Sequence, residues 1–295
     1  DGHSHSEQSD IAEVTDGTGM VGDTILTSTG TKLENIGVVD IAADGTIDAT
    51  TIPMEDVTAT EGFTPDQAIA DRVAEINAQI EEEMGVVIGT SEVNLNGVKE
   101  EVRAGETNLG DLCADAYRTV LGADIAFVNG GGIRDNIAAG DITYGQIIAV
   151  HPFGNTACVV EATGQEIIDA LEMASRSAPG ENGGFLQVAG ATYEIHTDIP
   201  NTVQTDEKNV WIGSATGTPR VQNVKIYDKA SGSYLPLDPG ATYALAGMNY
   251  TLRNLGDGFA MFDGATLIKD YVSEDYLVMS TYAMIFDAVN DVPVL

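Results

Sequence analysis

The sequence predicts a mixed α/β (α+β) domain in which helices flank a mixed sheet. From residue 86 onward, short apolar runs typical of strands alternate with segments whose apolar residues recur every three or four positions. Gly, Pro and Asp separate these segments, and two of the predicted helices begin with capping sequences. With 295 residues, 43% of them apolar, the chain is long enough to bury a core.

The first 85 residues predict two different segments. Residues 1–60 are rich in Thr, Asp and Gly, with strand-like runs at 23–28 and 36–42, which is typical of the end of a sheet. Residues 61–85 predict a connector helix of roughly five turns. Thr64 is its expected cap, followed by Pro65 at the first helical position. Its apolar stripe consists of Ile69, Val73, Ile76, Ile80 and Met84.

Residues 86–295 predict one further domain. A helix is expected over 108–121, and capping boxes at Thr143 to Gln146 and at Thr163 to Glu166 predict two more helix starts, the second running to about Ser175. The predicted strands are residues 86–89, 123–129, 185–189, 192–197, 221–227 and 242–246. The remainder of the chain is expected to be rich in strands.

The charge of the chain excludes two classes of partner. The 46 acidic and 13 basic residues give a net charge of −33, which disfavours nucleic acid polymers and anionic membrane surfaces. No run of about 18 apolar residues occurs, so no membrane insertion is expected. The sequence defines no oligomeric state.

The two cysteines, Cys113 and Cys158, are too few for a disulfide-stapled scaffold. Cys113 lies in a helical pattern and Cys158 in a strand-like one, which favours two small buried side chains over a nucleophile. Whether they pair stays open at this point.

A glycine run follows a predicted strand at NGGGIRD, residues 129–135. Consecutive glycines allow backbone N–H groups to approach a ligand, and Arg134 can donate to a phosphate. Neither the P-loop ending nor the dinucleotide glycine spacing is present. The segment alone fits an anion site and a simple turn equally well.

Other candidate groups lie in short turns. Phe153 and Asn155 in HPFGN, and Tyr250 upstream of Asp257, combine an aromatic ring with a polar neighbour, which suits a stacked base. Arg103 precedes a predicted helix start. Taken singly, each is more often a core ring, a turn residue or a surface ion-pair partner. His151, although it adjoins this turn, shows no sign of acting as an acid or base.

Several motifs resemble, in the same order, the C-terminal domain of the 5′-nucleotidase family, with its UDP-sugar hydrolase and 2′,3′-cyclic phosphodiesterase relatives. They are Arg103 with GETNLGDL at 105–112, NGGGIRD at 129–135, HPFGN at 151–155, GGFLQVAG at 183–190 and LGDGFAMF at 255–262. The resemblance covers residues from about 86 to 290. Several spaced motifs in one order are more specific than any single one.

The resemblance implies a role for each candidate residue. Phe153 and Tyr250 would stack on the base, Asn129 and Asn155 would contact its edge, Asp257 would hold the ribose, and Arg103, Gly131 and Arg134 would line the phosphate site. One departure concerns the second ring. The family has it six residues before the Asp, where this chain has Thr251, so Tyr250 requires a one-residue bulge or another alignment.

The N-terminal DGHSH resembles the last metal-ligand motif of the metallophosphoesterase domain that precedes this one in the family. His3 and His5 would then be ligands of a site for two divalent metal ions, and residues 1–60 would be the remnant of that domain. Without the resemblance, a ragged terminus or tag remnant is the simpler interpretation. Because the other expected ligand segments do not occur, we expect a truncated fragment that binds no metal stably and is inactive alone.

These observations favour a nucleotide-recognition domain of a metal-dependent 5′-nucleotidase-type hydrolase, which binds a nucleoside or nucleotide and positions its phosphate. A non-catalytic nucleoside-binding or cell-surface module is the alternative, and a structural envelope domain without a ligand is a third possibility. The resemblance and the acidic composition imply an extracellular or cell-envelope location.

Overall fold

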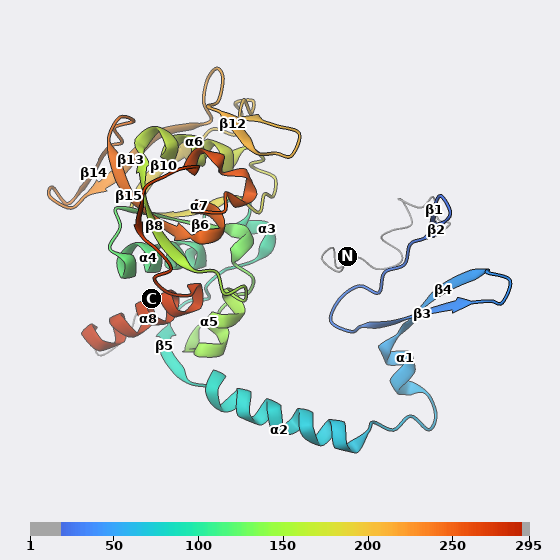
Figure 1. The fold of residues 1–295 in the computed structure, drawn as a ribbon. Coiled ribbons are helices and arrows are strands. Elements are labelled where there is room, and N and C mark those ends of the chain that lie inside the picture. The colour runs from blue at the N-terminus through green and yellow to red at the C-terminus, as the bar shows by residue number, and fades with distance from the viewer. Residues whose placement is uncertain (1–18, 291–295) are drawn as a thin grey trace. The chain divides into compact units, whose positions relative to one another are not determined.

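The computed structural model describes residues 19–290, and the chain divides into two compact units with the boundary between Asn77 and Ala78. The mixed sheet with flanking helices that the sequence predicts is confirmed in the second unit (Figure 1). In the part of the chain described, no helix combines the length and the apolar composition needed to cross a membrane.

The first unit contains two small hairpins. Strands β1 (Met20–Val21) and β2 (Thr24–Ile25) form one, and β3 (Asn35–Ile41) and β4 (Ile47–Pro53) form the other, followed by helix α1 (Met54–Ala59). In the second hairpin, Asp44 accepts a hydrogen bond from the Thr46 N–H at 3.0 Å, and Gly45 has a φ of +89°, which suits glycine in a tight turn.

Helix α2 (Gln67–Met84) spans the boundary between the units. Its start corrects the predicted cap. The Asp66 carboxylate accepts the Ile69 N–H at 3.2 Å, whereas the Thr64 hydroxyl donates to the Gly62 carbonyl. Asp66 directly precedes the helix and Thr64 lies too far upstream. The apolar stripe is present but exposed; the exposed fraction of Ile69 is 65%.

The second unit is built on a five-stranded sheet with the order β16-β8-β15-β6-β9. These strands are β6 (Ile125–Asn129), β8 (Ala157–Thr163), β9 (Leu186–Ala189), β15 (Thr242–Met248) and β16 (Leu267–Lys269). Strands β6 and β15 are parallel neighbours, and every other pair in this sheet is antiparallel. The sheet is therefore mixed.

Both faces of this sheet are buried. Alternate residues of β6, such as Ala126 and Val128, pack on one face with helices α4 (Asn108–Leu121) and α8 (Asp275–Asn290). Ile125 and Phe127 point to the other face, where they join the core with helix α6 (Gly164–Ser175). The period-two alternation of a strand explains why both sets are apolar.

Smaller elements complete the second unit. The two-stranded sheet β5-β7, the three-stranded sheet β10-β13-β14 and the pair β11-β12 surround the main sheet. Their bounds are β5 (Val87–Ser91), β7 (Gly140–Thr143), β10 (Ala191–Ile195), β11 (Gln204–Thr205), β12 (Trp211–Gly213), β13 (Val221–Asp228) and β14 (Ser233–Pro236). The short helices are α3 (Lys99–Val102), α5 (Tyr144–Val150), α7 (Asn249–Leu252) and the 3-10 turns η1 (Gly130–Gly132), η2 (Gly256–Gly258) and η3 (Ala260–Phe262).

Several local predictions are confirmed. Helix α4 has the predicted bounds, and the capping boxes of Thr143 with Gln146 and of Thr163 with Glu166 are both formed. Both cysteines are buried and free. The expectation of a strand-rich C-terminal part is wrong for its last segment, because helix α8 runs from Asp275 to Asn290.

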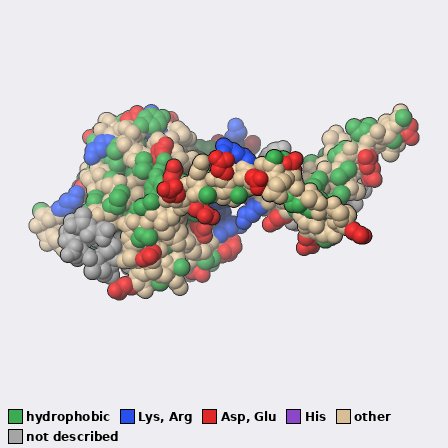
Figure 2. All heavy atoms as spheres, turned by 90° about the horizontal axis from the view of Figure 1, so that it is seen from below, with side chains coloured by type: hydrophobic (Ala, Val, Ile, Leu, Met, Phe, Trp, Pro, Cys, Tyr) green, Lys and Arg blue, Asp and Glu red, His purple; other side chains and the backbone are tan. Residues whose placement is uncertain are grey.

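Acidic side chains are scattered over the face shown in Figure 2, whereas Lys and Arg side chains occupy a few separate places. Because the chain is so acidic, each basic side chain offsets the negative field locally. The position and contacts of each one therefore indicate where a negatively charged group could be accommodated.

Candidate functional site

The topology brings the sequence motifs to one edge of the central sheet. Parallel strands β6 and β15 both end there, at Asn129 and Met248. The antiparallel strands β8 and β9 begin there, since Ala157 pairs with Met248 and Leu186 pairs with Asn129. The loops that follow β6 and β15 and those that precede β8 and β9 therefore meet at this edge, where ligands of mixed and parallel sheets commonly bind.

The glycine run packs against the loop that precedes β9. Gly130 N–H donates to the Phe185 carbonyl at 2.7 Å, and Gly131 N–H donates to the Gly183 carbonyl at 2.8 Å. A Cβ atom on Gly130 would overlap the Val102 carbonyl. These two N–H groups are thus not available to a ligand, and the glycines instead allow a close approach of three backbone segments.

A chain of hydrogen bonds joins three predicted site residues. Asn129 Nδ2 donates to one carboxylate oxygen of Asp257 at 3.1 Å, and the Tyr250 hydroxyl donates to the other at 3.2 Å. Asn129 is buried, and its Oδ1 has no hydrogen-bond partner in the described structure. Burial, followed by the nearby Asp257 carboxylate, raises the pKa of Tyr250. The tyrosine therefore stays a neutral donor.

Tyr250 and Thr251 occupy different environments. Tyr250 has an exposed fraction of 38%, whereas Thr251 is buried at 2%. The residue that stands six positions before Asp257 thus cannot present a side chain to a ligand, and the ring seven positions before it can. Leu255, directly before the 3-10 turn η2, and Asp257, within it, both have left-handed φ values, of +56° and +54°. Such strained backbone is frequent at functional sites.

Phe153 and Arg134 lie together on the surface. The exposed fraction of Phe153 is 58%, and the Arg134 guanidinium carbon lies 5.3 Å from the centre of its ring. Arg134 Nη1 also donates to the Gly131 carbonyl at 3.3 Å. The guanidinium is therefore oriented by its own loop, while a large aromatic surface stays open beside it.

Asn155 is fixed through its backbone. Its N–H donates to Asp275 Oδ2 at 3.1 Å, and its carbonyl accepts the Asp275 N–H at 2.8 Å. Asp275 is fully buried, and burial raises the pKa of this carboxyl to about 6. The Asn155 side chain also interacts with this carboxylate, because backbone and side-chain hydrogen bonds from Asn155 both oppose the rise in the pKa of Asp275.

Arg103 reaches this edge from the loop after α3. Its carbonyl accepts the Asn182 N–H at 2.9 Å, which ties it to the loop before β9. The Nε atom is buried without a hydrogen-bond partner among the described residues. A buried guanidinium nitrogen without a partner is costly, so its presence indicates a group that can be satisfied by a further acceptor.

Sequence reasoning missed one cation. Arg176 follows α6, and its Nη1 donates to the Met173 carbonyl at 2.7 Å. Burial lowers the pKa of Arg176, and the Asp257 carboxylate opposes this shift, which shows that the guanidinium lies within the electrostatic field of Asp257. Arg176 belongs to none of the motifs. Only the scarcity of arginine in so acidic a chain could have drawn attention to it.

His151 has no part in the open site. It is fully buried, its Nδ1 lies 3.3 Å from the Gly132 carbonyl, and burial lowers its pKa to about 4. The imidazole is therefore neutral at physiological pH.

The proposed metal ligands His3 and His5 lie outside the described residues. Within residues 19–290, no group of three or more His, Cys, Asp or Glu side chains is placed to hold a metal ion. The described residues by themselves therefore do not fit a two-metal site, and the groups gathered at this edge are hydrogen-bonding, aromatic and basic side chains.

Residues 87–264 match the family model described as the 5′-nucleotidase C-terminal domain. The chain belongs to this family. Among curated proteins, it is 34% identical over 206 residues to a trifunctional nucleotide phosphoesterase of Bacillus subtilis, and 33% identical over 181 residues to the UshA protein of Escherichia coli. These matches cover 68% and 61% of this chain.

A solved structure agrees with the sequence comparison. The 5′-nucleotidase precursor of Thermus thermophilus is 29% identical, with a TM-score of 0.63 and coverage of 89% of this chain. The match spans 49% of that structure, and the curated matches span 13% of the B. subtilis protein and 28% of the E. coli protein. The chain thus corresponds to a minor part of the curated relatives named here.

Proposed function

We propose that this 5′-nucleotidase C-terminal domain binds a nucleoside or nucleotide at the edge where β6 and β15 end. In this proposal the base lies against Phe153 and Tyr250, with Asn129 and Asn155 at its edge. Asp257 accepts from the ribose hydroxyls, and Arg103 and Arg134 bind the phosphate.

One observation carries the proposal. The hydrogen-bonded chain from Asn129 through Asp257 to Tyr250 holds a carboxylate and an open aromatic ring beside each other at the end of two parallel strands. Each Asp257 oxygen has one protein donor and retains a further lone pair, which suits two neighbouring hydroxyl groups. The ring complements a planar base and the carboxylate complements a pair of ribose hydroxyls, which are the two parts of a nucleoside.

The proposed role within a whole protein is that of substrate recognition for phosphoester hydrolysis. Residues 1–60 are then the end of a metallophosphoesterase domain, 61–85 the connector and 86–295 the recognition domain. Divalent metal ions belong to the catalytic domain, with His3 and His5 as proposed contributors. Because the described residues hold no fitting donor group, no catalytic step is assigned to them. An extracellular or cell-envelope location is part of the same proposal.

Calorimetric titration of adenosine and of AMP into the chain tests the proposal. We expect saturable binding of both, with AMP the tighter ligand because it adds contacts to Arg103 and Arg134. Replacing Phe153 with Ala removes a stacking surface worth about 1–3 kcal/mol, which is a loss of affinity of about 5- to 150-fold.

The matched control is Tyr234→Ala, an exposed aromatic on β14 that carries no proposed ligand contact. It should leave adenosine affinity unchanged. Failure of the folded wild-type chain to bind either ligand at millimolar concentration would contradict the proposed function.

A further inference from the structure

Two consecutive residues after the Phe153 turn are each held by a reciprocal pair of hydrogen bonds. Asn155 exchanges such a pair with Asp275, as described above. Thr156 does the same with Asn249: its N–H donates to Asn249 Oδ1 at 3.0 Å, and its carbonyl accepts the Asn249 N–H at 2.8 Å.

The second pair continues the sheet by one residue. In the antiparallel ladder of β8 and β15, Met248 is the partner of Ala157, so the next pair in this register is Asn249 with Thr156. A regular ladder would use the Asn249 backbone carbonyl as acceptor for the Thr156 N–H. That carbonyl is engaged elsewhere, because it accepts the Arg253 N–H at 3.0 Å and the Asn254 N–H at 2.9 Å.

The side chain of Asn249 therefore takes the place of its own backbone carbonyl. Its backbone turns into α7, while its amide oxygen completes the ladder with Thr156. The amide does not cap α7, whose N-cap residue Met248 makes no side-chain capping bond. Because the side-chain oxygen replaces the backbone carbonyl in the ladder, α7 can begin at Asn249 itself, and the half-buried Thr156 N–H still has an acceptor.

The linked segments are those that carry the two rings. Tyr250 follows Asn249 directly, and Phe153 lies three residues before Thr156. The Asp275 pair, in contrast, links the Phe153 segment to α8, which carries no proposed ligand contact. Of the two pairs, the one made by Asn249 is therefore the direct tie between the ring-bearing segments.

We propose that Asn249 is a positioning residue that sets the spacing between Phe153 and Tyr250 and so determines nucleoside affinity. The inference rests on the proposed function. Asn249 itself touches no ligand in this scheme; it acts by fixing the end of β15 against the start of β8, on which both rings depend.

Calorimetry with adenosine tests this inference on three variants of the chain. Adenosine is neutral, so a charge introduced at position 249 does not repel it. Asn249→Ala removes the acceptor and is expected to weaken binding about tenfold, within the range of one lost stacking contact. Asn249→Asp keeps an oxygen at the same position. Its affinity for adenosine is expected to stay within about threefold of the wild-type value, which is clearly smaller than the tenfold loss expected for Asn249→Ala.

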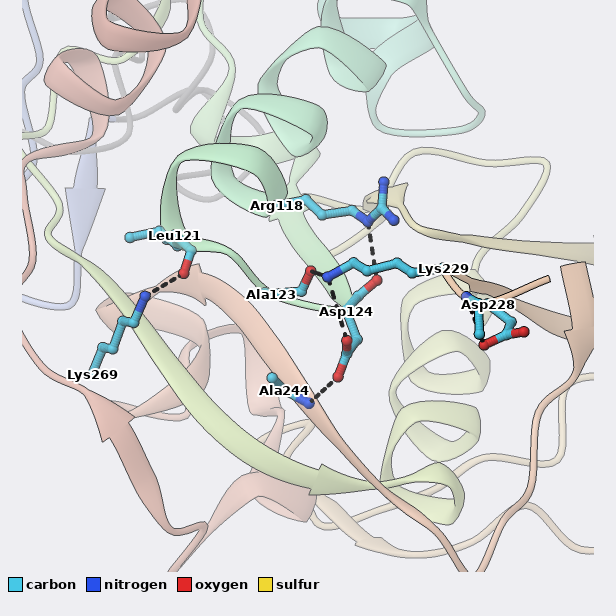
Figure 3. Close-up of polar contacts among 9 residues, drawn as sticks. Arg118, Leu121, Ala123, Asp124, Asp228, Lys229, Ala244 and Lys269 are labelled. Carbon is cyan, nitrogen blue, oxygen red and sulfur yellow. Dashed lines mark hydrogen bonds and ion pairs between the residues drawn. The ribbon is translucent and has the colours of Figure 1, made fainter. Parts of the chain in front are cut away.

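The matched control lies at the other end of the same strand. Asp124 Oδ2 accepts the Ala244 N–H at 3.0 Å, close to the start of β15 (Figure 3). Asp124→Ala also removes a side-chain acceptor of a backbone N–H, so it should lower the unfolding temperature as Asn249→Ala does. It should leave adenosine affinity unchanged, because it alters neither ring-bearing segment.

A structural readout accompanies the titrations. The Thr156 amide should exchange with solvent faster in Asn249→Ala than in the wild type, and at the wild-type rate in Asn249→Asp. If Asn249→Ala does not fold, Asn249→Gln replaces it: this variant keeps the amide but moves it by one methylene, and it should also weaken binding.

The outcomes separate the two proposals. Absence of adenosine binding by the wild type overturns the proposed function and this inference together. Binding by the wild type with unchanged affinity of Asn249→Ala, or of Asn249→Gln in its place, overturns this inference alone. Equal losses in Asn249→Ala, Asn249→Asp and Asp124→Ala do the same, because they would reflect general destabilisation.

Discussion

At the edge of the sheet where β6 begins, Lys269 donates to the Leu121 carbonyl at 2.6 Å, and Arg118 Nε donates to the Asp124 carbonyl at 3.0 Å (Figure 3). Lys229 lies 3.8 Å from the Asp124 carboxylate. At the opposite edge, where β6 ends, Arg103 and Arg134 make no ion pair with any carboxylate among the described residues.

Positive charge serves different purposes at the two edges of this sheet. At the first edge Lys269 satisfies the carbonyl of the last residue of α4, which stabilises the helix terminus, while Arg118 and Lys229 contact Asp124 just before β6. At the second edge the Arg134 guanidinium lies beside the exposed Phe153 ring, and the Arg103 Nε is buried without a partner among the described residues, in a chain whose net charge is −33. We infer that removing charge should cost stability at the first edge and ligand affinity at the second.

The largest expected effect is on phosphate binding. Arg134→Ala should weaken AMP binding by about 10- to 150-fold, because charge-assisted hydrogen bonds are worth about 1.5–3 kcal/mol. Adenosine, which lacks the phosphate, should lose far less. Parallel titrations of both ligands measure this ratio. Arg118→Ala is the control from the opposite edge, and a similar loss of AMP affinity in that variant would remove the distinction between the edges.

The next effect is a pH dependence at the ligand edge. The pKa of Asp275 is raised to about 6 in the folded state, so the folded protein binds more protons than the unfolded chain between about pH 4 and 6. The ionised carboxylate thus destabilises the fold at pH 7, and this cost disappears as the pH falls below 4.

Asp275→Asn tests this sign. Melting curves at pH 7 and pH 4 should show the variant gaining stability relative to the wild type at the higher pH, since Asn carries no charge at either. Other carboxyl groups with raised pKa values, such as Asp111, are common to both proteins and cancel in the comparison. A difference that does not change with pH would show that Asp275 does not titrate as its burial implies.

A smaller effect is expected at the opposite edge. Lys269→Ala removes a charged donor from the end of α4, which should cost about 1 kcal/mol, or about 2–4 °C in unfolding temperature. Differential scanning calorimetry measures the shift, and the affinity for AMP should stay the same. Weaker AMP binding without a change in unfolding temperature would be the opposite of what the hydrogen bonds predict.

The smallest effect concerns the Tyr250 hydroxyl. Tyr250→Phe keeps the ring but removes the donor to Asp257, a bond worth about 0.5–1.5 kcal/mol, so adenosine should bind a few-fold more weakly. Tyr250→Ala, which removes the ring as well, should lose considerably more. Equal losses in the two variants would mean that the ring contributes no stacking.

Much of the fold could be predicted because local signals were strong. Helix α4 follows from its apolar spacing, and Thr107 and Gly122 cap its two ends. Helices α5 and α6 follow from their capping boxes, in each of which both hydrogen bonds are formed. Helix α8 was missed because it is apolar almost all round, so its sequence lacks the polar face that marks an amphipathic helix.

The site could be predicted only in part, for physical reasons. Asn129, Tyr250 and Asp257 belong to short motifs, and the structure brings them within hydrogen-bond distance. Arg176 and Asn249 depend on contacts between segments far apart in the chain, which no local pattern encodes. The glycine run shows the limit most clearly: its composition favours ligand contact through N–H groups, but pairing with the loop before β9 occupies two of them.

One face of Tyr250 is already covered. A Cβ atom on Gly256 would overlap three atoms of the ring, so the ring lies flat against that glycine. Under the proposed function, a base would therefore stack on the opposite face of the ring. A side chain larger than hydrogen at position 256 would displace the ring and should weaken adenosine binding, although Gly256 itself is assigned no ligand contact.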